Sequence, residues 1–363
     1  MNVRFTRKEC GDMTLEGMLE SAVQKQASDI FLVVGQPVSF KIEGVIEKQD
    51  EESLRPERME ELVNQMYGMA NRDTNARKHG DDDFSVSLPH VGRFRVNVFK
   101  QRGSWSAVMR VVTFELPDIS QMGIPQSVLD LGEKKKGLIL VTGPAGSGKS
   151  TTLAYIIDRI NKTRNCHILT LEDPIEFLHK HGNSIVSQRE IGIDSSNYSR
   201  ALKAALREAP DVILIGEMRD LETIEIAMTA AETGHLVLSS LHTVGAANTI
   251  DRIVDVFPPD QQQQIRLQLA MVLQSVVSQQ LLPSLSGRMV PAFEIMHVNK
   301  AIQTLIREGK VHQINSTIAT NAEEGMIAMD KSLLNLYRQG EISDLTALSS
   351  CLNKDAMARE LRR

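Results

Sequence analysis

The sequence predicts an α/β protein with two domains, of which the second carries a parallel β-sheet. Between residues 126 and 255, short apolar runs of the buried-strand type alternate with helical stretches, which is the pattern of a parallel sheet covered by helices. Residues 1–115 instead mix amphipathic helices with alternating strands, as a smaller α+β domain does. A segment with two prolines and a glycine, 116–125, separates the two patterns and is predicted as a linker, so the second domain spans 126–363.

In the first domain, the helical spacing of apolar residues predicts helices over 14–27 and 56–69. A strand meander is expected over 83–112, because apolar and polar residues alternate along it, most clearly from Phe94 to Phe99. Glycine-punctuated runs predict three further short strands, at 29–34, 37–42 and 45–48.

Four apolar runs predict the buried strands of the second domain, at 137–142, 167–171, 212–215 and 236–240. From about residue 258 onward, the chain is expected to be mostly helical. One continuous helix is predicted over 261–282, where apolar residues such as Ile265, Leu269, Val272 and Val276 recur on roughly one side.

The composition limits the class of protein. The net charge of −5 and the pI of about 6.0 argue against a protein that mainly binds nucleic acid, although they leave a local basic channel open. Cys10, Cys166 and Cys351 form no Cys-x-x-Cys pair, so neither a zinc site nor a disulfide framework is expected. No run approaches the ~18 apolar residues that cross a bilayer. We therefore expect a cytoplasmic protein that reaches a membrane only through a partner.

The run from Gly143 to Ser150 matches the phosphate-binding pattern G-x-x-x-x-G-K-S in full. It follows an apolar strand and precedes a helical stretch at 151–160, which is the context that supports this motif. Glycines let backbone N–H groups turn toward phosphates, and the helix N-terminus adds partial positive charge. Lys149 is expected to contact the phosphates of ATP, and Ser150 to offer its hydroxyl to Mg²⁺. The predicted nucleotide-binding residues are Gly143, Pro144, Ala145, Gly146, Ser147, Gly148, Lys149, Ser150 and Thr151.

Carboxylates follow two of the predicted strands. Glu217 ends the run that begins at Asp211, and in phosphate-loop enzymes such a strand presents an acid to Mg²⁺ or water. Glu172, Asp173 and Glu176 cluster after the strand at 167–171, which suits the orientation of a nucleophilic water. Solvated surface acids are the alternative for both groups.

His235 and His242 bracket the predicted strand at 236–240. Each is a candidate to lie near the γ-phosphate and to report its presence, with an ordinary structural histidine as the alternative. A metal site is not expected here, because no cysteine or third histidine has suitable spacing.

Four arginines lie in the last predicted strands of the first domain: Arg93, Arg95, Arg102 and Arg110. Guanidinium forks suit phosphate oxygens and can complete a nucleotide site from a neighbouring subunit. Solvent-facing strand arginines are the alternative.

These motifs together make the chain resemble the type II/type IV secretion superfamily of ATPases and, within it, the type IV pilus retraction ATPases. The resemblance covers nearly the whole chain. Four ordered boxes carry it, at 143–152, 171–177, 211–220 and 233–243. The stretch 301–310, Ala-Ile-Gln-Thr-Leu-Ile-Arg-Glu-Gly-Lys, further resembles a motif of the retraction branch.

The resemblance implies a homohexamer in which each subunit has a PAS-like N-terminal domain and a RecA-like ATPase domain. It implies an ATP- and Mg²⁺-dependent motor that acts on an inner-membrane pilus platform protein, with an accessory retraction ATPase as a further candidate partner. Direct membrane insertion and nucleic-acid binding are not expected. The implied catalytic residues are Glu217, Glu176, Lys149, Arg95, Arg110 and His242, with His235 and Arg102 on the nucleotide and Ser150 and Glu217 on the metal.

Three alternatives remain open from the sequence. A hexameric nucleic-acid motor shares the phosphate loop, but the acidic pI and the lack of a basic, aromatic-interleaved loop argue against it. An ATP-binding scaffold would need a defective site, yet Lys149, Ser150, Glu176 and Glu217 are all present. The accessory retraction ATPase is a closer alternative, and the run Met218–Thr223 favours the main retraction branch over it.

Overall fold

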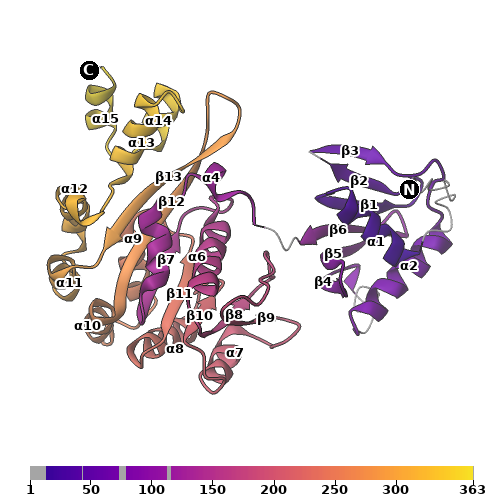
Figure 1. Cartoon of the computed structure of the whole chain (residues 1–363), viewed down its shortest axis with the longest axis horizontal. Coiled ribbons are helices and arrows are strands. Elements are labelled where there is room, and N and C mark those ends of the chain that lie inside the picture. Colours follow the sequence, from indigo (N-terminus) through magenta and orange to yellow (C-terminus); the bar gives the residue numbers. More distant parts are fainter. Residues whose placement is uncertain (1–13, 43, 73–78, 113–115, 363) are drawn as a thin grey trace. The chain divides into compact units, whose positions relative to one another are not determined.

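The computed structural model of the chain describes residues 14–42, 44–72, 79–112 and 116–362. Its contacts divide the protein into two compact units, Met1–Phe114 and Glu115–Arg363 (Figure 1). Each unit has its own hydrophobic core. Cys10 lies outside the described residues, and Cys166 and Cys351 are free thiols.

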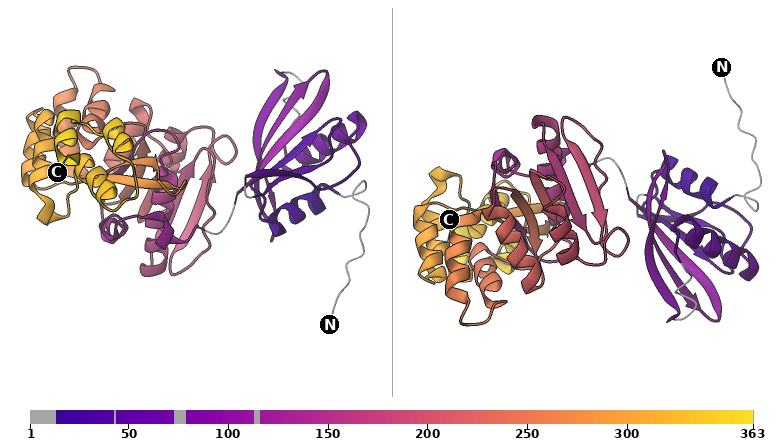
Figure 2. Two further views of the ribbon diagram at one scale, coloured as in Figure 1. Left: turned by 90° about the horizontal axis from the view of Figure 1, so that it is seen from above. Right: turned by 90° about the horizontal axis from the view of Figure 1, so that it is seen from below.

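In the described residues of the first unit, helices α1 and α2 pack on an antiparallel sheet with the strand order β3-β2-β1-β6-β5-β4. Figure 2 shows both helices on the same face of this sheet. Side chains of the helices, such as Leu19 and Met66, share a core with Phe94 and Met109 of the sheet. The helices are α1 (Leu15–Gln24) and α2 (Pro56–Met69); the strands are β1 (Asp29–Val33), β2 (Ser39–Ile42), β3 (Val45–Lys48), β4 (Asp81–Leu88), β5 (Gly92–Gln101) and β6 (Ser104–Val112).

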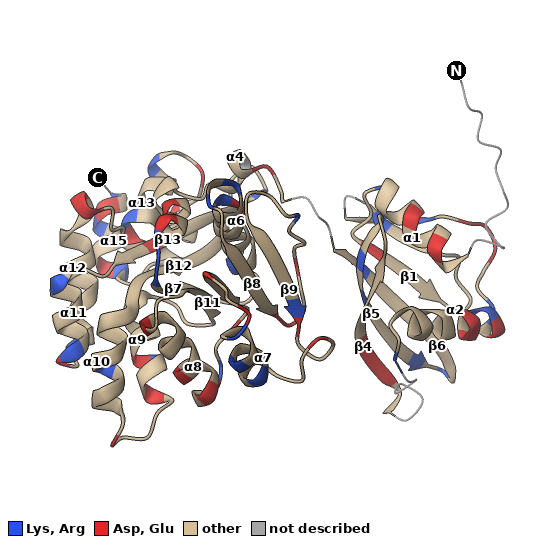
Figure 3. Cartoon of the chain, turned by 60° about the horizontal axis from the view of Figure 1, so that its bottom comes forward, with Lys and Arg blue, Asp and Glu red and all other residues tan. Residues whose placement is uncertain are grey.

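The sequence patterns of this unit are confirmed element by element. In β5, Phe94, Val96 and Val98 are buried and alternate with less buried polar residues, as the sequence pattern predicts. The edge strand β4 begins with three consecutive aspartates, Asp81 to Asp83 (Figure 3). Charges at a sheet edge discourage pairing with a further strand, so this edge is protected.

The second unit contains one seven-stranded sheet in the order β13-β12-β7-β11-β10-β8-β9. Neighbouring strands from β12 to β9 run parallel, and β13 pairs antiparallel with β12. The strands are β7 (Gly137–Thr142), β8 (His167–Glu172), β9 (Ile185–Glu190), β10 (Val212–Ile215), β11 (Leu236–Leu241), β12 (Leu273–Pro283) and β13 (Met289–His297).

Helices cover both faces of this sheet, which explains why its strands are almost wholly apolar. Ile139 and Val141 of β7 share a core with α6 (Lys149–Thr163), whereas Leu138 and Leu140 face the opposite core. That second core includes α7 (Tyr198–Ala205), α8 (Leu221–Glu232), α9 (Ala246–Asp255) and α10 (Gln262–Val272).

The predicted helix over 261–282 is wrong beyond Val272, where α10 ends and the 11-residue strand β12 begins. The strand lies inside the sheet with both faces covered, so Val276 and Val277 are both buried, on opposite sides. An apolar run of this kind does not distinguish a strand from a helix by periodicity alone. Strands β9 and β13 were likewise absent from the sequence prediction.

The remainder of the unit is helical. The residues predicted as a linker contain the short helix α4 (Ile119–Met122). In α11 (Lys300–Arg307), Ile302 and Ile306 are buried, whereas Ala301 is exposed. None of the helices described is long and apolar enough to span a bilayer. The other helices are α5 (Gln126–Leu129), α12 (Ile314–Thr320), α13 (Met329–Arg338), α14 (Asp344–Ser350) and α15 (Lys354–Leu361).

Candidate active site

The phosphate-binding loop connects the buried strand β7 to the first turn of α6. Two of its glycines lie against Gln279 of the neighbouring strand β12. A Cβ atom on Gly143 (φ 146°) would lie 2.1 Å from the backbone oxygen of Gln279. A Cβ atom on Gly148 (φ 86°) would lie 2.9 Å from Nε2 of the same side chain. Packing and backbone conformation therefore both require glycine at these positions.

Lys149 is the first residue of α6 and is only 7% exposed. Its Nζ donates to the backbone oxygens of Gly143 at 2.9 Å and Pro144 at 2.8 Å, so the ammonium group is held over the loop. Burial lowers the pKa of Lys149, and the nearby carboxylates of Glu176 and Glu217 oppose this shift. The side chain is thus placed to meet an anion bound in the loop.

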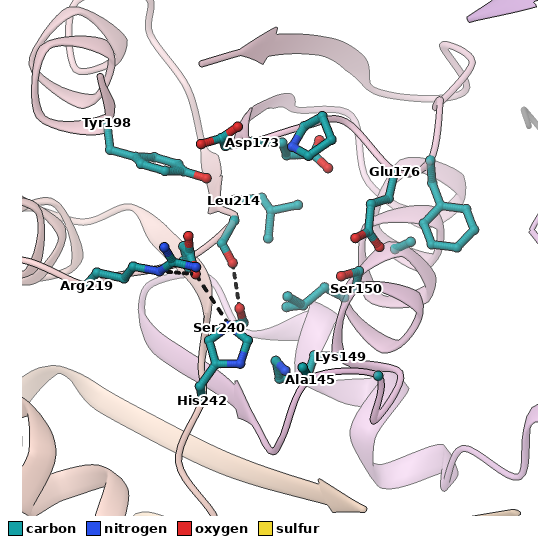
Figure 4. Close-up of a pocket in the computed structure, with 18 of the residues that line it drawn as sticks. Ala145, Lys149, Ser150, Asp173, Glu176, Tyr198, Leu214, Arg219, Ser240 and His242 are labelled. Atoms are coloured by element: carbon teal, nitrogen blue, oxygen red, sulfur yellow. Dashed lines mark hydrogen bonds and ion pairs between the residues drawn. The ribbon is translucent and has the colours of Figure 1, made fainter. Parts of the chain in front are cut away.

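Beside this loop lies a pocket of about 280 Å³, at the edge of the sheet where the parallel strands end (Figure 4). Ala145, Gly146, Lys149 and Ser150 form one wall of it. Residues that follow β8, β10 and β11 form the opposite wall, which is the usual position of ligands in open parallel sheets. The carboxylates in this pocket belong to Glu172, Asp173, Glu176 and Glu217.

Glu217 lies just after β10, and its side chain is 16% exposed. Arg219 Nε approaches its Oε2 at 2.7 Å, and His242 Nε2 lies 3.5 Å from the same oxygen (Figure 4). Ser240 Oγ of β11 donates to the backbone oxygen of Gly216 at 2.6 Å, which ties the residue before Glu217 to the next strand. The carboxylate is therefore oriented from two sides.

Glu172, the last residue of β8, has a different environment from Glu217. Burial raises the pKa of Glu172 to about 7, and the charge of Glu176 adds to this effect. Hydrogen bonds to its Oε1 from Thr170 Oγ1 at 2.7 Å and Gln188 Nε2 at 3.2 Å act in the opposite direction. The pocket thus contains one carboxyl group that titrates near neutrality.

The two candidate histidines lie at opposite ends of β11. His242 follows the strand and lines the pocket. His235 precedes the strand, and its backbone oxygen accepts from Gly137 N at the start of β7, whereas the phosphate loop begins at the other end of β7. The prediction that His235 contacts the nucleotide of its own subunit is therefore wrong. A histidine on each side of a six-residue strand cannot reach the same site, because the strand spans about 20 Å.

Comparison with known proteins places the chain in a family. Residues 9–338 match the family described as Type II/IV secretion system protein. The chain belongs to this family. The type IV pilus retraction ATPase PilT of Pseudomonas aeruginosa is 43% identical over 331 residues, which are 91% of this chain and 96% of PilT. A twitching motility protein of Neisseria gonorrhoeae is 48% identical over 277 residues, 76% of this chain and 74% of that protein.

Solved structures agree with this assignment. A crystal structure of the pilus retraction motor PilT with bound ADP has a TM-score of 0.86 and 45% identity, and it covers 96% of this chain and 100% of that chain. The ATPase DotB of Legionella pneumophila has a TM-score of 0.79 and 30% identity, with 96% and 97% coverage. The predicted fold, a RecA-like domain after a smaller N-terminal domain, and the predicted resemblance to pilus retraction ATPases are both confirmed. This member of the type II/IV secretion family is an ATPase.

Seven of the predicted site residues line the pocket of this family member: Ala145, Gly146, Lys149, Ser150, Glu176, Glu217 and His242. The other predicted loop residues build the turn and the start of α6 around the pocket: Gly143, Pro144, Ser147, Gly148 and Thr151.

The candidate arginines lie in the unit Met1–Phe114. Arg95 and Arg110 stand directly opposite each other in the β5–β6 register, and Arg110 Nε pairs with Asp29 at 3.2 Å. Arg102 lies in the turn between the two strands, with a φ of 50°. All three side chains are exposed. A role of Arg95, Arg102 and Arg110 in binding nucleotide stays a prediction.

The donor set of the pocket fits Mg²⁺ held together with phosphates. In the part of the chain that the structure describes, no group of three or more His, Cys, Asp or Glu side chains forms a metal cage. Mg²⁺ commonly takes one or two protein oxygens and completes its shell with phosphate and water. Ser150 and Glu217 offer such oxygens from facing walls of the pocket.

Sequence reasoning missed several residues that shape this site. Gln279 of β12 accepts a 2.7 Å hydrogen bond from Thr152 Oγ1 and packs against the phosphate loop, but the helix predicted at that point concealed it. Tyr198 and His179 line the pocket without belonging to any motif. Arg219 lies within the box at 211–220. Its position two residues after Glu217 was the sequence signal that could have identified it as a site residue.

Proposed function

We propose that this ATPase is a motor that powers type IV pilus retraction, the disassembly of pilin filaments that drives twitching motility. The observation that carries the proposal is one pocket in which Lys149 of the phosphate loop faces Glu217 and Glu176. It occurs in a chain that aligns over 96% of the length of PilT at 43% identity. Relatives named for pilus retraction and twitching support the process.

Each residue has a chemical role in the proposed hydrolysis. Lys149 and the backbone N–H groups of the loop hold the β- and γ-phosphates. Glu217 orients the attacking water and takes up its proton, and Glu176, which lines the same pocket, assists. His242, which touches Glu217, relays whether the γ-phosphate is present. Mg²⁺, held by Ser150 and Glu217 with the phosphates, would neutralise charge that develops on the transferred group.

We further propose a homohexamer in which Arg95, Arg102 and Arg110 of one subunit close over the nucleotide of a neighbour. All three side chains are exposed on β5, β6 and their turn, so they are accessible to another chain. Light scattering with Mg-ATP should then give the mass of a ring, and a strictly monomeric species would contradict it. The motor would work at the cytoplasmic face of the inner membrane, on a platform protein and alongside an accessory retraction ATPase.

The helix α11 is our candidate for coupling hydrolysis to pilus withdrawal. Its buried residues Ile302 and Ile306 anchor it, and it packs on α10. The side chain of Arg307 is exposed and donates a hydrogen bond to Thr304 Oγ1 of its own helix, while the backbone oxygen of Arg307 accepts from Gln263 Nε2 of α10. A partner can therefore contact this face without altering the pocket.

The experiment is deletion of the gene, complementation with three forms, and imaging of surface pili together with ATPase assays of the purified proteins. The parent should restore retraction, and Lys149→Ala should restore neither retraction nor turnover. Arg307→Ala should keep its ATP turnover and lose retraction. Normal retraction in the deletion strain would overturn the proposed process. Strong stimulation of turnover by single-stranded DNA would favour a nucleic-acid motor instead.

A further inference from the structure

Tyr198 lines the pocket but has no role in the hydrolysis mechanism proposed for Lys149, Glu176 and Glu217. It is the first residue of α7, a helix whose start is fixed by Asn197, which accepts from Arg200 N at 2.8 Å. The half-buried ring packs against the larger core of the unit, so the side chain is held from behind. Its hydroxyl lies 2.8 Å from the point that a Cβ atom on Gly216 would occupy. The hydroxyl is therefore held at the residue that precedes Glu217.

The surroundings of this hydroxyl are acidic. Figure 4 shows Tyr198 pointing into the pocket toward Asp173, on the wall opposite Lys149 and Ser150. Burial raises the pKa of Tyr198 far above its usual range, and the carboxylates of Asp173, Glu217 and Glu172 raise it further. The phenol is thus a neutral donor and acceptor at any physiological pH, and it cannot serve as a base.

Among the described residues, the Tyr198 hydroxyl has no hydrogen-bond partner, although the ring is fixed and the pocket wall is polar. One oxygen of Glu217 is similarly available. Arg219 and His242 both approach Oε2, and among the described residues Oε1 has no ion-pair partner. The neutral hydroxyl of Tyr198 and the anionic carboxylate of Glu217 can therefore both form hydrogen bonds to a molecule bound in the pocket.

We propose that Tyr198 is a water-positioning residue of the hydrolytic site, and that its hydroxyl and the carboxylate of Glu217 together hold the water that attacks the γ-phosphate. This inference rests on the proposed ATP hydrolysis. The tyrosine hydroxyl accepts a hydrogen bond from one water proton, and Glu217 accepts the other. The oxygen lone pair of the water is thereby directed away from both groups and toward the phosphate held over Lys149.

The step balances without any further reactant. The water oxygen forms a bond to the γ-phosphorus, and the bond from that phosphorus to the bridging oxygen breaks, so ADP leaves with the electron pair. One water proton passes to Glu217 and is later released to solvent. Tyr198 keeps its own proton throughout and contributes only geometry, since its pKa is raised.

A purely structural tyrosine is the alternative, and the position of the hydroxyl distinguishes the two. For packing against the core, a phenylalanine ring would serve equally well. The hydroxyl instead fills the space beside Gly216, where even a methyl group on the backbone would collide with it. A role in packing alone gives no reason for that group.

The test is Tyr198→Phe, with Tyr337→Phe as the matched control. Tyr337 is also half-buried, but it lies in α13 and packs in the C-terminal cluster. Single-turnover hydrolysis of ATP and the affinity for a non-hydrolysable ATP analogue are measured for each protein, with thermal melting as the check on folding. We expect the hydrolysis rate constant of Tyr198→Phe to fall about five- to tenfold, as for loss of one hydrogen bond in the transition state. Analogue affinity should change less than twofold, and Tyr337→Phe should match the parent.

Two results would overturn the inference. One is a Tyr198→Phe rate within twofold of the parent; the other is an equal loss of rate and analogue affinity, which would mark a structural role. Gly216→Ala provides a second variant, because its methyl group should displace the hydroxyl. Gly216→Ala should lower the hydrolysis rate constant when it is introduced into the parent. It should lower this rate constant little further when it is introduced into Tyr198→Phe. Failure of the proposed function is distinguishable, since the parent itself would then show no Lys149-dependent hydrolysis.

Discussion

Two groups of strands in the sheet of the unit Glu115–Arg363 contribute to the site in different ways. Strands β7, β8, β10 and β11 each end in a segment that lines the pocket, and each segment carries a recognisable sequence motif. Strands β12 and β13 support the same region without lining it. Gln279 of β12 holds the phosphate loop, and Glu294 of β13 accepts from Ala246 N at 2.7 Å, at the start of the helix that follows His242. The residues that we propose to act in hydrolysis thus lie in motifs, whereas Gln279 and Glu294, which support the site, lie in strands without a motif.

Glu217→Gln tests the motif side of this comparison and should have the largest effect. The amide keeps the shape of the side chain but removes the charge that, in the proposed mechanism, orients and deprotonates the attacking water. Hydrolysis should slow by about 100-fold or more, the usual contribution of a general base, while ATP still binds. Turnover and equilibrium binding of a fluorescent ATP analogue measure the two effects separately. Glu225→Gln on the exposed face of α8 is the control, and near-normal hydrolysis by Glu217→Gln would remove Glu217 from the mechanism.

The same contrast explains how much could be predicted from sequence. The phosphate loop, Glu217 and His242 were found because phosphate chemistry constrains residue types at fixed spacing along one segment. Gln279 was not found, because its contact with Thr152 joins residues 127 positions apart and leaves no local pattern. His235 was misplaced for a related reason, since a motif gives the residues that flank a strand but not which end faces the ligand.

Gln279→Leu tests the supporting side. Leucine fills a similar volume but leaves the fully buried hydroxyl of Thr152 without its acceptor. An unsatisfied buried hydroxyl costs about 1–3 kcal/mol, so the melting temperature should fall and ATP binding should weaken, with a smaller effect on the hydrolysis step. The neighbouring Gln280, which reaches Ser350 O at 3.4 Å, provides the control Gln280→Leu. If both variants behaved alike, β12 would serve only as packing, and Gln279 would have no specific role in holding the phosphate loop.

Glu172→Gln should have the smallest effect, and its dependence on pH gives it diagnostic value. Glu172 belongs to a motif, yet Thr170 and Gln188 hold it as firmly as any supporting residue. A glutamine oxygen can accept the same two hydrogen bonds, so the substitution mainly removes the ionisable proton. Because the folded-state pKa of about 7 lies above the ordinary value of 4.5, the native state holds this proton more tightly than the unfolded state does.

The sign of the pH dependence follows from that difference. The stability that the protonated carboxyl group contributes is fully present below pH 4.5 and is lost as the pH rises through about 7. The melting temperature of Glu172→Gln relative to the parent should therefore increase across this window and level off above it, when both proteins are measured without nucleotide. Glu222→Gln is an informative control, because hydrogen bonds from Lys203 and Ser199 lower the pKa of Glu222 and give its carboxylate the opposite sign. If the difference in melting temperature between Glu172→Gln and the parent did not vary with pH, folding would not raise the pKa of Glu172.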